Sequence, residues 1–352
     1  LANRAIVATR NPNWSARLLQ FDILFGDWFM KSSLRPLTDR VTAHKCHLKR
    51  IGNLNGLRPL KIVLDSKILT FPLKSNRMHY QPDFLTYKPI FKSSEKELLL
   101  GLSKQYSLQN LIDNPRQFQD SSIEYSFVSS KIEGNAYTLK DTVNLIKFGY
   151  TAGSKTFNDA LMIKNINQAF DEICNRKHAI YPVLSKPFLC GLHETVSHDL
   201  LPKERCGVVR KENVSITGSH YIPLSGEALL DAELEVLLKV ANTIDDVFER
   251  AVYTHLNLAY LQYFLDGNKR TARLMQTAIL ADQGIMPLLL RVEDIIPYQT
   301  SVLEYYETGN YSSYAQLFVN GYQYTIALLQ GQTQEQIQAQ KLAEQAILAR
   351  GH

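Results

Sequence analysis

Cysteine is scarce in this sequence, and no two cysteines have the close spacing of a metal site. Four occur among the 352 residues, with no Cys-x-x-Cys pair: Cys46, Cys174, Cys190 and Cys206. The HKCH stretch places histidines on both sides of Cys46, but this spacing fits no standard zinc site. The pattern gives no disulfide framework and favours a reducing compartment, so we expect a cytoplasmic protein.

Long apolar runs are also missing, which argues against a membrane-spanning segment. A helix that crosses a bilayer needs about 18 consecutive apolar residues. The stretch FDILFGDWF is too short and contains Asp22 and Asp27. Hydrophobic residues make up 45% of the chain and charged residues 21%, as is ordinary for a globular protein.

Acidic residues are few in the first quarter of the chain. Residues 1–78 contain 14 Lys and Arg against 4 Asp and Glu, whereas the remainder has 25 basic and 30 acidic residues. Such a basic segment is typical of a nucleic-acid arm or a targeting peptide. The alternative is that Met78 is the natural start and that 1–78 is not native, because clean periodic patterns appear only after it. No helix-turn-helix pattern follows, so no nucleic-acid partner is expected.

Helical periodicity dominates from about residue 93. In 226–250 apolar residues recur at i, i+4, i+7, i+8, i+11 and i+14. Similar patterns cover 116–132, 138–149, 158–175, 184–198, 250–264, 270–284, 292–307 and 311–330. We therefore expect a mainly α-helical domain over 79–325. Residues 326–352, rich in Gln and Ala, are expected to form a helical or disordered tail.

One stretch, VVRKENVSITGSHYIPL at 208–224, departs from the helical pattern. Val214 and Ile216 alternate with Ser215 and Thr217, and a turn is expected at Gly218. Alternation of this kind around a glycine turn predicts a short β-hairpin among the helices.

The stretch YFLDGNKRTAR, at 263–273, has the composition of an anion site. A Gly-Asn turn leads into a helix, whose first N–H groups can bind an anion. Arg270 and Arg273 lie one turn apart and can fork onto phosphate oxygens, and Asp266 is a hard oxygen ligand suited to Mg²⁺. On spacing alone, a solvated helix start with an Asp-Gly turn explains the stretch equally well.

The stretch resembles the signature of the Fic family, His-Pro-Phe-x-Asp/Glu-Gly-Asn-Gly/Lys-Arg-x-x-Arg. The matching residues are Phe264, Asp266, Gly267, Asn268, Lys269, Arg270 and Arg273. SSKIEGN resembles the family's inhibitory helix, expected near 116–134, through Ser129, Glu133 and Gly134. The 208–224 stretch resembles the family's flap, with Val214, Ile216 and Gly218 on it. The resemblance covers 79–325 and implies a Fic-type helical core with a short β-hairpin flap.

By this resemblance, the protein moves AMP from ATP onto a hydroxyl of a target protein that docks on the flap. Asp266 would hold Mg²⁺, and Gly267, Asn268 and Lys269 would cradle the phosphates. Arg270 would neutralise them and Arg273 would fix the γ-phosphate. Glu133 would pair with Arg273 and so exclude ATP from the productive pose. The related Doc toxins, which transfer a γ-phosphate, lack the equivalents of Gly267 and Arg273, which disfavours a kinase.

The chain departs from the family at the histidine that takes the proton from the attacking hydroxyl. Gln262 stands there, and an amide is no base in the useful pKa range. His255, two helical turns earlier, is expected to belong to the core, and His220 on the flap is the other candidate base. Two hypotheses stay open: a weakened, autoinhibited adenylyltransferase, or an inactive Fic pseudoenzyme that binds ATP or a partner protein. Homo-oligomerisation also stays open.

Overall fold

The computed structural model describes residues 60–64, 67–71, 78–175 and 180–331. The chain divides into two units, Leu1–Asn76 and Arg77–His352. In the first unit, β1 (Leu60–Leu64) pairs antiparallel with β2 (Lys67–Phe71), with Leu60 opposite Phe71. The HKCH and FDILFGDWF stretches lie outside the described residues, and whether residues 1–78 are native remains a prediction.

The second unit is built mainly of α-helices, which confirms the predicted fold class. In chain order its principal elements are β3 (Met78–His79), α3 (Ser93–Gln105), α4 (Leu108–Ile112), α5 (Pro115–Ile132), α6 (Leu139–Phe148), α7 (Phe157–Cys174), α8 (Lys186–Ser197), β4 (Tyr221–Ile222), α9 (Glu227–Asn242), α10 (Val247–Leu261), α11 (Asn268–Asp282), α12 (Ile295–Thr308) and α13 (Ser312–Leu329).

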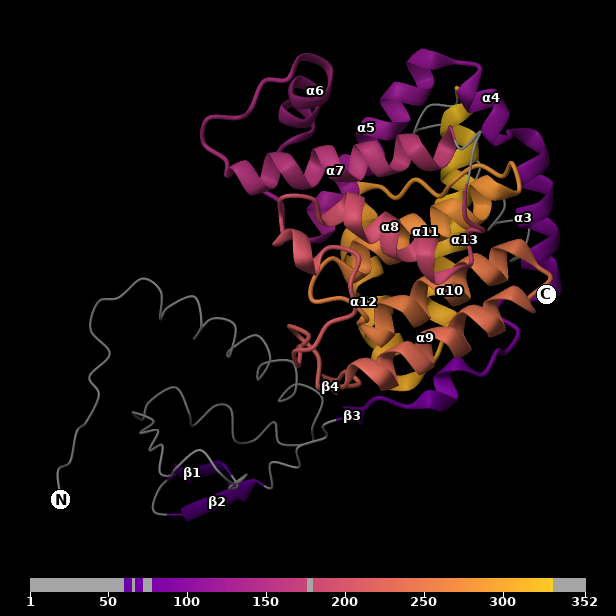
Figure 1. Cartoon of the computed structure of the whole chain (residues 1–352). Helices are drawn as coiled ribbons and strands as arrows, with labels where there is room; N and C mark the ends of the chain where they lie inside the picture. The colour runs from indigo at the N-terminus through magenta and orange to yellow at the C-terminus, as the bar shows by residue number, and fades with distance from the viewer. Residues whose placement is uncertain (1–59, 65–66, 72–77, 176–179, 332–352) are drawn as a thin grey trace. The chain divides into compact units, whose positions relative to one another are not determined.

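Helices α10 and α11 pack against each other at the centre of this unit (Figure 1). Helix α9 and α12 contact α10, while α7 and α8 contact α11. Nearly all residues of the two central helices are buried, on every face of each helix. A helix that is buried all round belongs to the interior of a domain. The loop between α10 and α11 is therefore held by a rigid frame.

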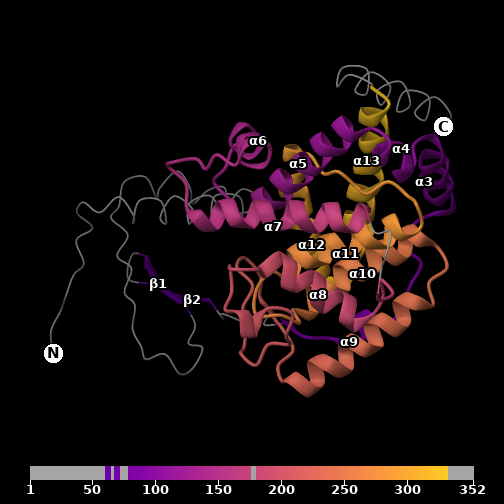
Figure 2. The same ribbon diagram turned by 45° about the horizontal axis from the view of Figure 1, so that its top comes forward.

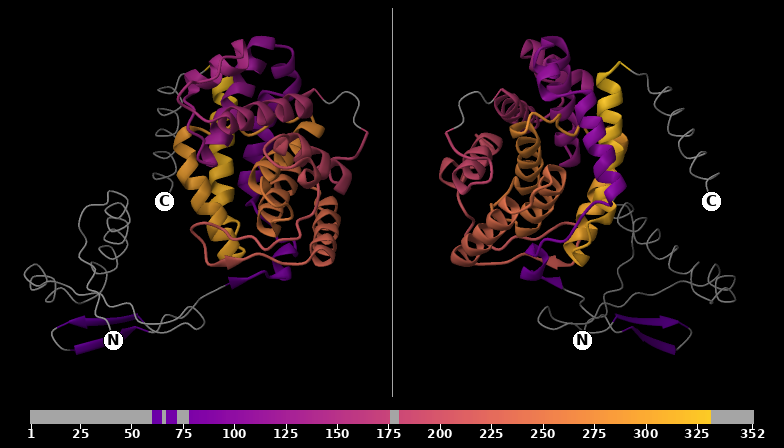
Figure 3. Two further views of the ribbon diagram at one scale, coloured as in Figure 1. Left: turned by 60° about the vertical axis from the view of Figure 1, so that its left-hand side comes forward. Right: turned by 90° about the vertical axis from the view of Figure 1, so that its right-hand side faces the viewer.

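Outer helices join parts of the sequence that are far apart. Helix α3, near the start of the unit's sequence, lies alongside α13, its last helix (Figure 3). Helix α6 packs against α5 and α7 at one side (Figure 2). Helix α5, whose C-terminal end carries Glu133, contacts α7 and α12 and is thereby fixed against the core.

The apolar pattern over 226–250 predicts one helix, but the structure has a break within this segment. Helix α9 ends at Asn242, and α10 begins at Val247. Between them Asp246 caps α10, because its carboxylate accepts hydrogen bonds from the N–H groups of Phe248 and Glu249, at 2.9 Å each. An N-terminal cap of this kind starts a new helix even where the apolar period continues.

The prediction of a β-hairpin over 208–224 is wrong. Within this segment only Tyr221–Ile222 forms a strand, β4, and it pairs in parallel with Met78–His79 of β3. Thr217 and Gly218 do form a turn, with Gly218 at a φ of 83°. The partner of the strand lies about 140 residues away, and local alternation cannot indicate so distant a pairing.

Helix α13 is the last element that the structure describes, and the pattern over 311–330 predicts its extent. Helix α13 runs on to Leu329, and residues 332–352 lie outside the described part of the chain. Among the residues that the structure describes, no helix is both long enough and apolar enough to cross a bilayer.

Candidate functional site

The loop Gln262–Gly267 between α10 and α11 is braced from within by Asn268. The side-chain oxygen of Asn268 accepts a hydrogen bond from the N–H of Phe264, and its amide nitrogen donates to the carbonyl of Phe264, both at 2.8 Å. Asn268 is only 7% exposed. The family resemblance predicts that Asn268 binds phosphate, whereas its side chain here fixes the shape of the loop.

Gln262 adopts the left-handed conformation, with a φ of 51°, and terminates α10. Its amide nitrogen donates to the carbonyl of Ala259 at 2.7 Å, and its amide oxygen accepts from Asn268 at 3.2 Å. Both ends of the buried side chain are therefore engaged. In this state Gln262 is turned back onto its own helix.

Gly267 precedes α11 with a φ of 74°, a conformation that side chains rarely adopt. A Cβ there would also lie 3.5 Å from Nε2 of His193. The Nδ1 atom of His193 accepts from the N–H of Gly207 at 2.8 Å, so Nε2 carries the proton and donates to the carbonyl of Asp266 at 3.0 Å. Burial lowers the pKa of His193 to about 4, so this buried imidazole is neutral at pH 7 and positions the loop.

Arg270 presents a buried cation with unused donors. Its Nη2 atom donates to the Asp266 carboxylate at 2.8 Å. In the described part of the chain, Nε and Nη1 are buried and have no hydrogen-bond partner. Arg270 is 4% exposed, and buried donors without partners are strongly unfavourable. These atoms are suited to an anion, beside the free N–H groups of the first turn of α11.

Arg273 is held on every side by residues of α5 and α12. Its Nε donates to the hydroxyl of Ser129 at 2.9 Å, and Nη2 donates to the Ser129 carbonyl at 3.0 Å and to Glu133 Oε1 at 2.9 Å. Its Nη1 donates to the hydroxyl of Tyr298 at 3.1 Å. The predicted contact between Glu133 and Arg273 is thus present.

Positively charged side chains surround the Glu133 carboxylate. Its Oε2 atom also lies 3.4 Å from the ammonium group of Lys269. Burial opposes its ionisation, but Arg273, Lys269 and Arg270 outweigh burial and hold the pKa of Glu133 below its ordinary value of 4.5. Burial likewise opposes the charge of Arg273, yet Tyr298 and Glu133 raise its pKa above the usual value. Both groups are therefore charged at neutral pH.

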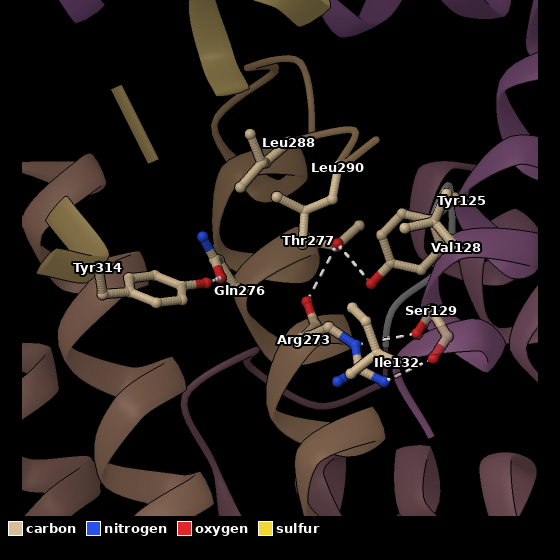
Figure 4. A pocket seen from close by; sticks show the side chains of 10 residues that line it. All are labelled: Tyr125, Val128, Ser129, Ile132, Arg273, Gln276, Thr277, Leu288, Leu290 and Tyr314. Atoms are coloured by element: carbon tan, nitrogen blue, oxygen red, sulfur yellow. Dashed lines mark hydrogen bonds between the residues drawn. The ribbon is translucent and has the colours of Figure 1, made fainter. Parts of the chain in front are cut away.

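A small cavity of about 20 Å³ lies beside Arg273, lined by residues of α5, α11 and the segment before α12 (Figure 4). Ser129 and Thr277 border it, and Thr277 donates to the hydroxyl of Tyr125 at 3.2 Å. This volume is sufficient for a water molecule or two. It is far too small for a nucleotide.

The remaining predicted residues lie apart from this cluster. Gly134 follows Glu133 with a φ of 86° and ends α5. Val214 and Ile216 are half-buried in the segment before β4. His255 is fully buried, with Nε2 at 3.2 Å from the Tyr298 hydroxyl, and burial lowers its pKa to about 3. It belongs to the core, as predicted, while His220 is exposed before β4.

Three contributors to the site were not singled out in the sequence: His193, Tyr298 and Arg210. They come from α8, α12 and the segment between α8 and β4. No local spacing relates them to the Asp266–Arg273 stretch. Only the packing of the helices brings them to the loop.

The fold and the site together define a helical domain in which a braced loop leads into a helix with two buried arginines, the second of them in contact with a carboxylate. Residues 183–280 match the model of the Fic/DOC family. The chain therefore contains a Fic/DOC family domain, which confirms the resemblance to this family, while the likeness of SSKIEGN to an inhibitory helix stays a prediction.

Curated relatives agree with this identification. Protein adenylyltransferase fic-1 of Caenorhabditis elegans is 25% identical over 191 residues, which cover 53% of this chain and 37% of the relative. Protein adenylyltransferase Fic of Nematostella vectensis is 26% identical over 182 residues, which cover 51% of this chain and 42% of the relative. The matches thus span well under half the length of these relatives.

Solved structures share the fold. A fragment of Fic-1 from C. elegans has a TM-score of 0.56 at 19% identity, covering 68% of this chain and 72% of that chain. A Fic family protein from Desulfovibrio desulfuricans G20 has a TM-score of 0.58 at 16% identity, covering 69% of this chain and 77% of that one. The arrangement of helices around the loop is therefore that of known Fic proteins.

Proposed function

We propose that this protein is an adenylyltransferase that moves AMP from ATP to a hydroxyl group of a protein, restrained by Glu133. The observation that carries the proposal is the cationic end of α11. Arg270 keeps two buried donors free, and Arg273 is occupied by a carboxylate from another helix. This is the arrangement expected of a phosphate site whose last position is filled by the protein itself.

The residues present fit ATP with Mg²⁺. The orphaned Nε and Nη1 atoms of Arg270 are suited to phosphate oxygens, and the Asp266 side chain is 64% exposed and can offer an oxygen to a cation. No group of three or more His, Cys, Asp or Glu able to hold a metal occurs in the described residues. One carboxylate suffices for Mg²⁺, which keeps several waters and binds phosphates. When bound, Mg²⁺ would neutralise charge that develops on the phosphates.

The protein's own contribution is to hold the phosphates in line. Arg270 and the first N–H groups of α11 would bind them, and Arg273 would fix the γ-phosphate. Glu133 now occupies that place, so α5 has to move or Glu133 has to turn away before ATP binds productively. Most of the expected rate enhancement then comes from positioning and electrostatics.

The acceptor hydroxyl is proposed to arrive on the segment that contains Val214, Ile216 and Gly218. Exposed and half-buried residues alternate from Asn213 to Thr217, as in an extended chain with one face on the protein. Such an edge can pair with a target segment through backbone hydrogen bonds. Gln262 can orient the hydroxyl but not take its proton, so we expect slow transfer.

A second candidate function is nucleotide or partner-protein binding without catalysis. The engagement of both ends of the Gln262 side chain, by Ala259 and Asn268, favours this alternative. In that state the side chain is 7% exposed and held at both ends, which limits the access of an acceptor hydroxyl to its remaining N–H and lone pair. Transfer would then require Gln262 to leave both partners.

Transfer of label from α-labelled and γ-labelled ATP decides between the candidates. We expect Glu133→Gly to transfer α-label with Mg²⁺, slowly, to itself or to proteins of a cell lysate, and to transfer no γ-label. Arg273→Met in the same background is the control and should abolish transfer. ATP binding without any transfer would favour the binding protein, and γ-label transfer would contradict the proposed reaction.

A further inference from the structure

Arg210 connects the segment before β4 to the turn at Gln262 entirely through backbone groups. Its side chain donates from Nε to the carbonyl of Gln262, from Nη1 to that of Glu212 and from Nη2 to that of Leu224. Its own N–H donates to the carbonyl of Tyr263 at 3.1 Å. One residue thereby joins four points of the backbone.

This guanidinium group is buried without a direct salt bridge, and the nearby Glu212 carboxylate only partly offsets the effect of burial on its pKa. Arg210 is 1% exposed, and among the described residues no carboxylate lies within ion-pair distance of it. Burial lowers its pKa from the ordinary value. The Glu212 carboxylate, which could have neutralised it, instead pairs with Arg205. A buried cation held only by carbonyls is unfavourable for stability, which suggests that it is retained for geometry.

Two of these four backbone points flank the segment proposed to receive the acceptor, and a third is Gln262. Glu212 and Leu224 are the residues on either side of 213–223, the segment proposed to receive the acceptor. Gln262 occupies the position of the family's histidine and is held in the left-handed conformation. The planar fork of an arginine has fixed donor directions, so it sets the distance between these parts more rigidly than a lysine would.

We propose that Arg210 is a positioning residue that holds the acceptor segment 213–223 in register with residue 262. The inference rests on the proposed transfer reaction. Arg210 acts on the placement of the acceptor hydroxyl and should change the binding of ATP little, because its contacts in this loop are to the carbonyls of Gln262 and Tyr263 and not to the residues proposed to bind phosphate. A displacement of about 1 Å at a reacting group can lower a rate about 100-fold.

Label transfer tests this in the background Glu133→Gly/Gln262→His, where transfer is expected to be fastest. Arg210→Met is expected to lower α-label transfer about 100-fold and to change the Kd of ATP less than threefold. Arg210→Lys, which keeps the charge and three donors, should recover part of the rate. The control is Arg205→Met, which removes the partly buried ion pair with Glu212 from the same segment and should leave transfer within a few-fold of its parent.

Amide hydrogen exchange supplies a readout that does not depend on catalysis. In the otherwise native chain, Arg210→Met and Arg210→Lys should accelerate exchange in 211–224 and 260–264 together, whereas Arg205→Met should leave 260–264 unchanged. If both Arg210 variants match Arg205→Met in exchange, the proposal is wrong. It is also wrong if ATP binding falls in parallel with transfer. If the parent transfers no label, the proposed function fails, and exchange alone then decides the role of Arg210.

Discussion

Replacing Gln262 by histidine in the Glu133→Gly background should raise α-label transfer from ATP about 10²- to 10⁴-fold. A positioned general base contributes a factor of this size, and the amide of Gln262 contributes none. Histidine tolerates the left-handed conformation better than most residues, so the turn with a φ of 51° should persist. Initial rates of transfer into a lysate, at saturating ATP and Mg²⁺, measure the effect.

The matched control introduces a histidine elsewhere. Gln316→His exchanges the same two residue types on the exposed face of α13 and should leave transfer unchanged. If Gln262→His gives no more transfer than Gln316→His, residue 262 does not occupy the position of a base. If the Glu133→Gly parent is already as fast as the double variant, proton transfer does not limit the reaction.

Replacing Glu133 by glycine should lower the Kd of ATP about 10- to 100-fold. The carboxylate accepts a charge-assisted hydrogen bond from Arg273, and such a bond contributes roughly 1.5–3 kcal/mol, equivalent to that range of affinity. If the proposed function is correct, ATP has to displace this contact in the native protein and does not in the variant. Calorimetric titration with ATP and Mg²⁺ measures both affinities.

The ratio of the Kd of ATP for the native chain to that for Glu133→Gly should not change between pH 6 and pH 8. The pKa of Glu133 lies below 4.5 in the folded protein and that of Arg273 above its usual value, so both remain charged throughout this window. The stabilising contribution of the carboxylate is present above its unfolded pKa and is lost only as pH falls through the lower folded value. Glu172→Gly, which removes an exposed carboxylate from α7, is the control and should bind ATP as the native chain does. Equal affinities for Glu133→Gly and the native chain would contradict autoinhibition.

Periodicity and motif register predict the helices and the main contact of the site. The pattern at 116–132 corresponds to α5 (Pro115–Ile132), and that at 311–330 to α13 (Ser312–Leu329). The likeness of SSKIEGN to an inhibitory helix places Glu133 opposite Arg273, where the structure has it. Helical periodicity is a local signal, and the motif identifies Glu133 directly, so the sequence alone is sufficient to predict these helices and this contact.

Long-range contacts could not be predicted in this way. The strand Tyr221–Ile222 finds its partner in Met78–His79, so the expected hairpin does not form. His193 reaches the loop from α8, and Arg210 reaches the turn at Gln262 from across the fold. No sequence spacing encodes these pairs, because they depend on how the helices pack.

Titration of ATP and Mg²⁺ into Glu133→Gly and into Glu133→Gly/Arg270→Met tests the central claim that the free donors of Arg270 belong to a nucleotide site. We expect the second variant to bind ATP about 100-fold more weakly, because several charge-assisted hydrogen bonds to phosphate are lost. Glu133→Gly/Arg116→Met, which removes an exposed arginine at the start of α5, should bind as tightly as Glu133→Gly. Equal affinities with and without Arg270 would show that the nucleotide, if it binds, does not bind at the first turn of α11.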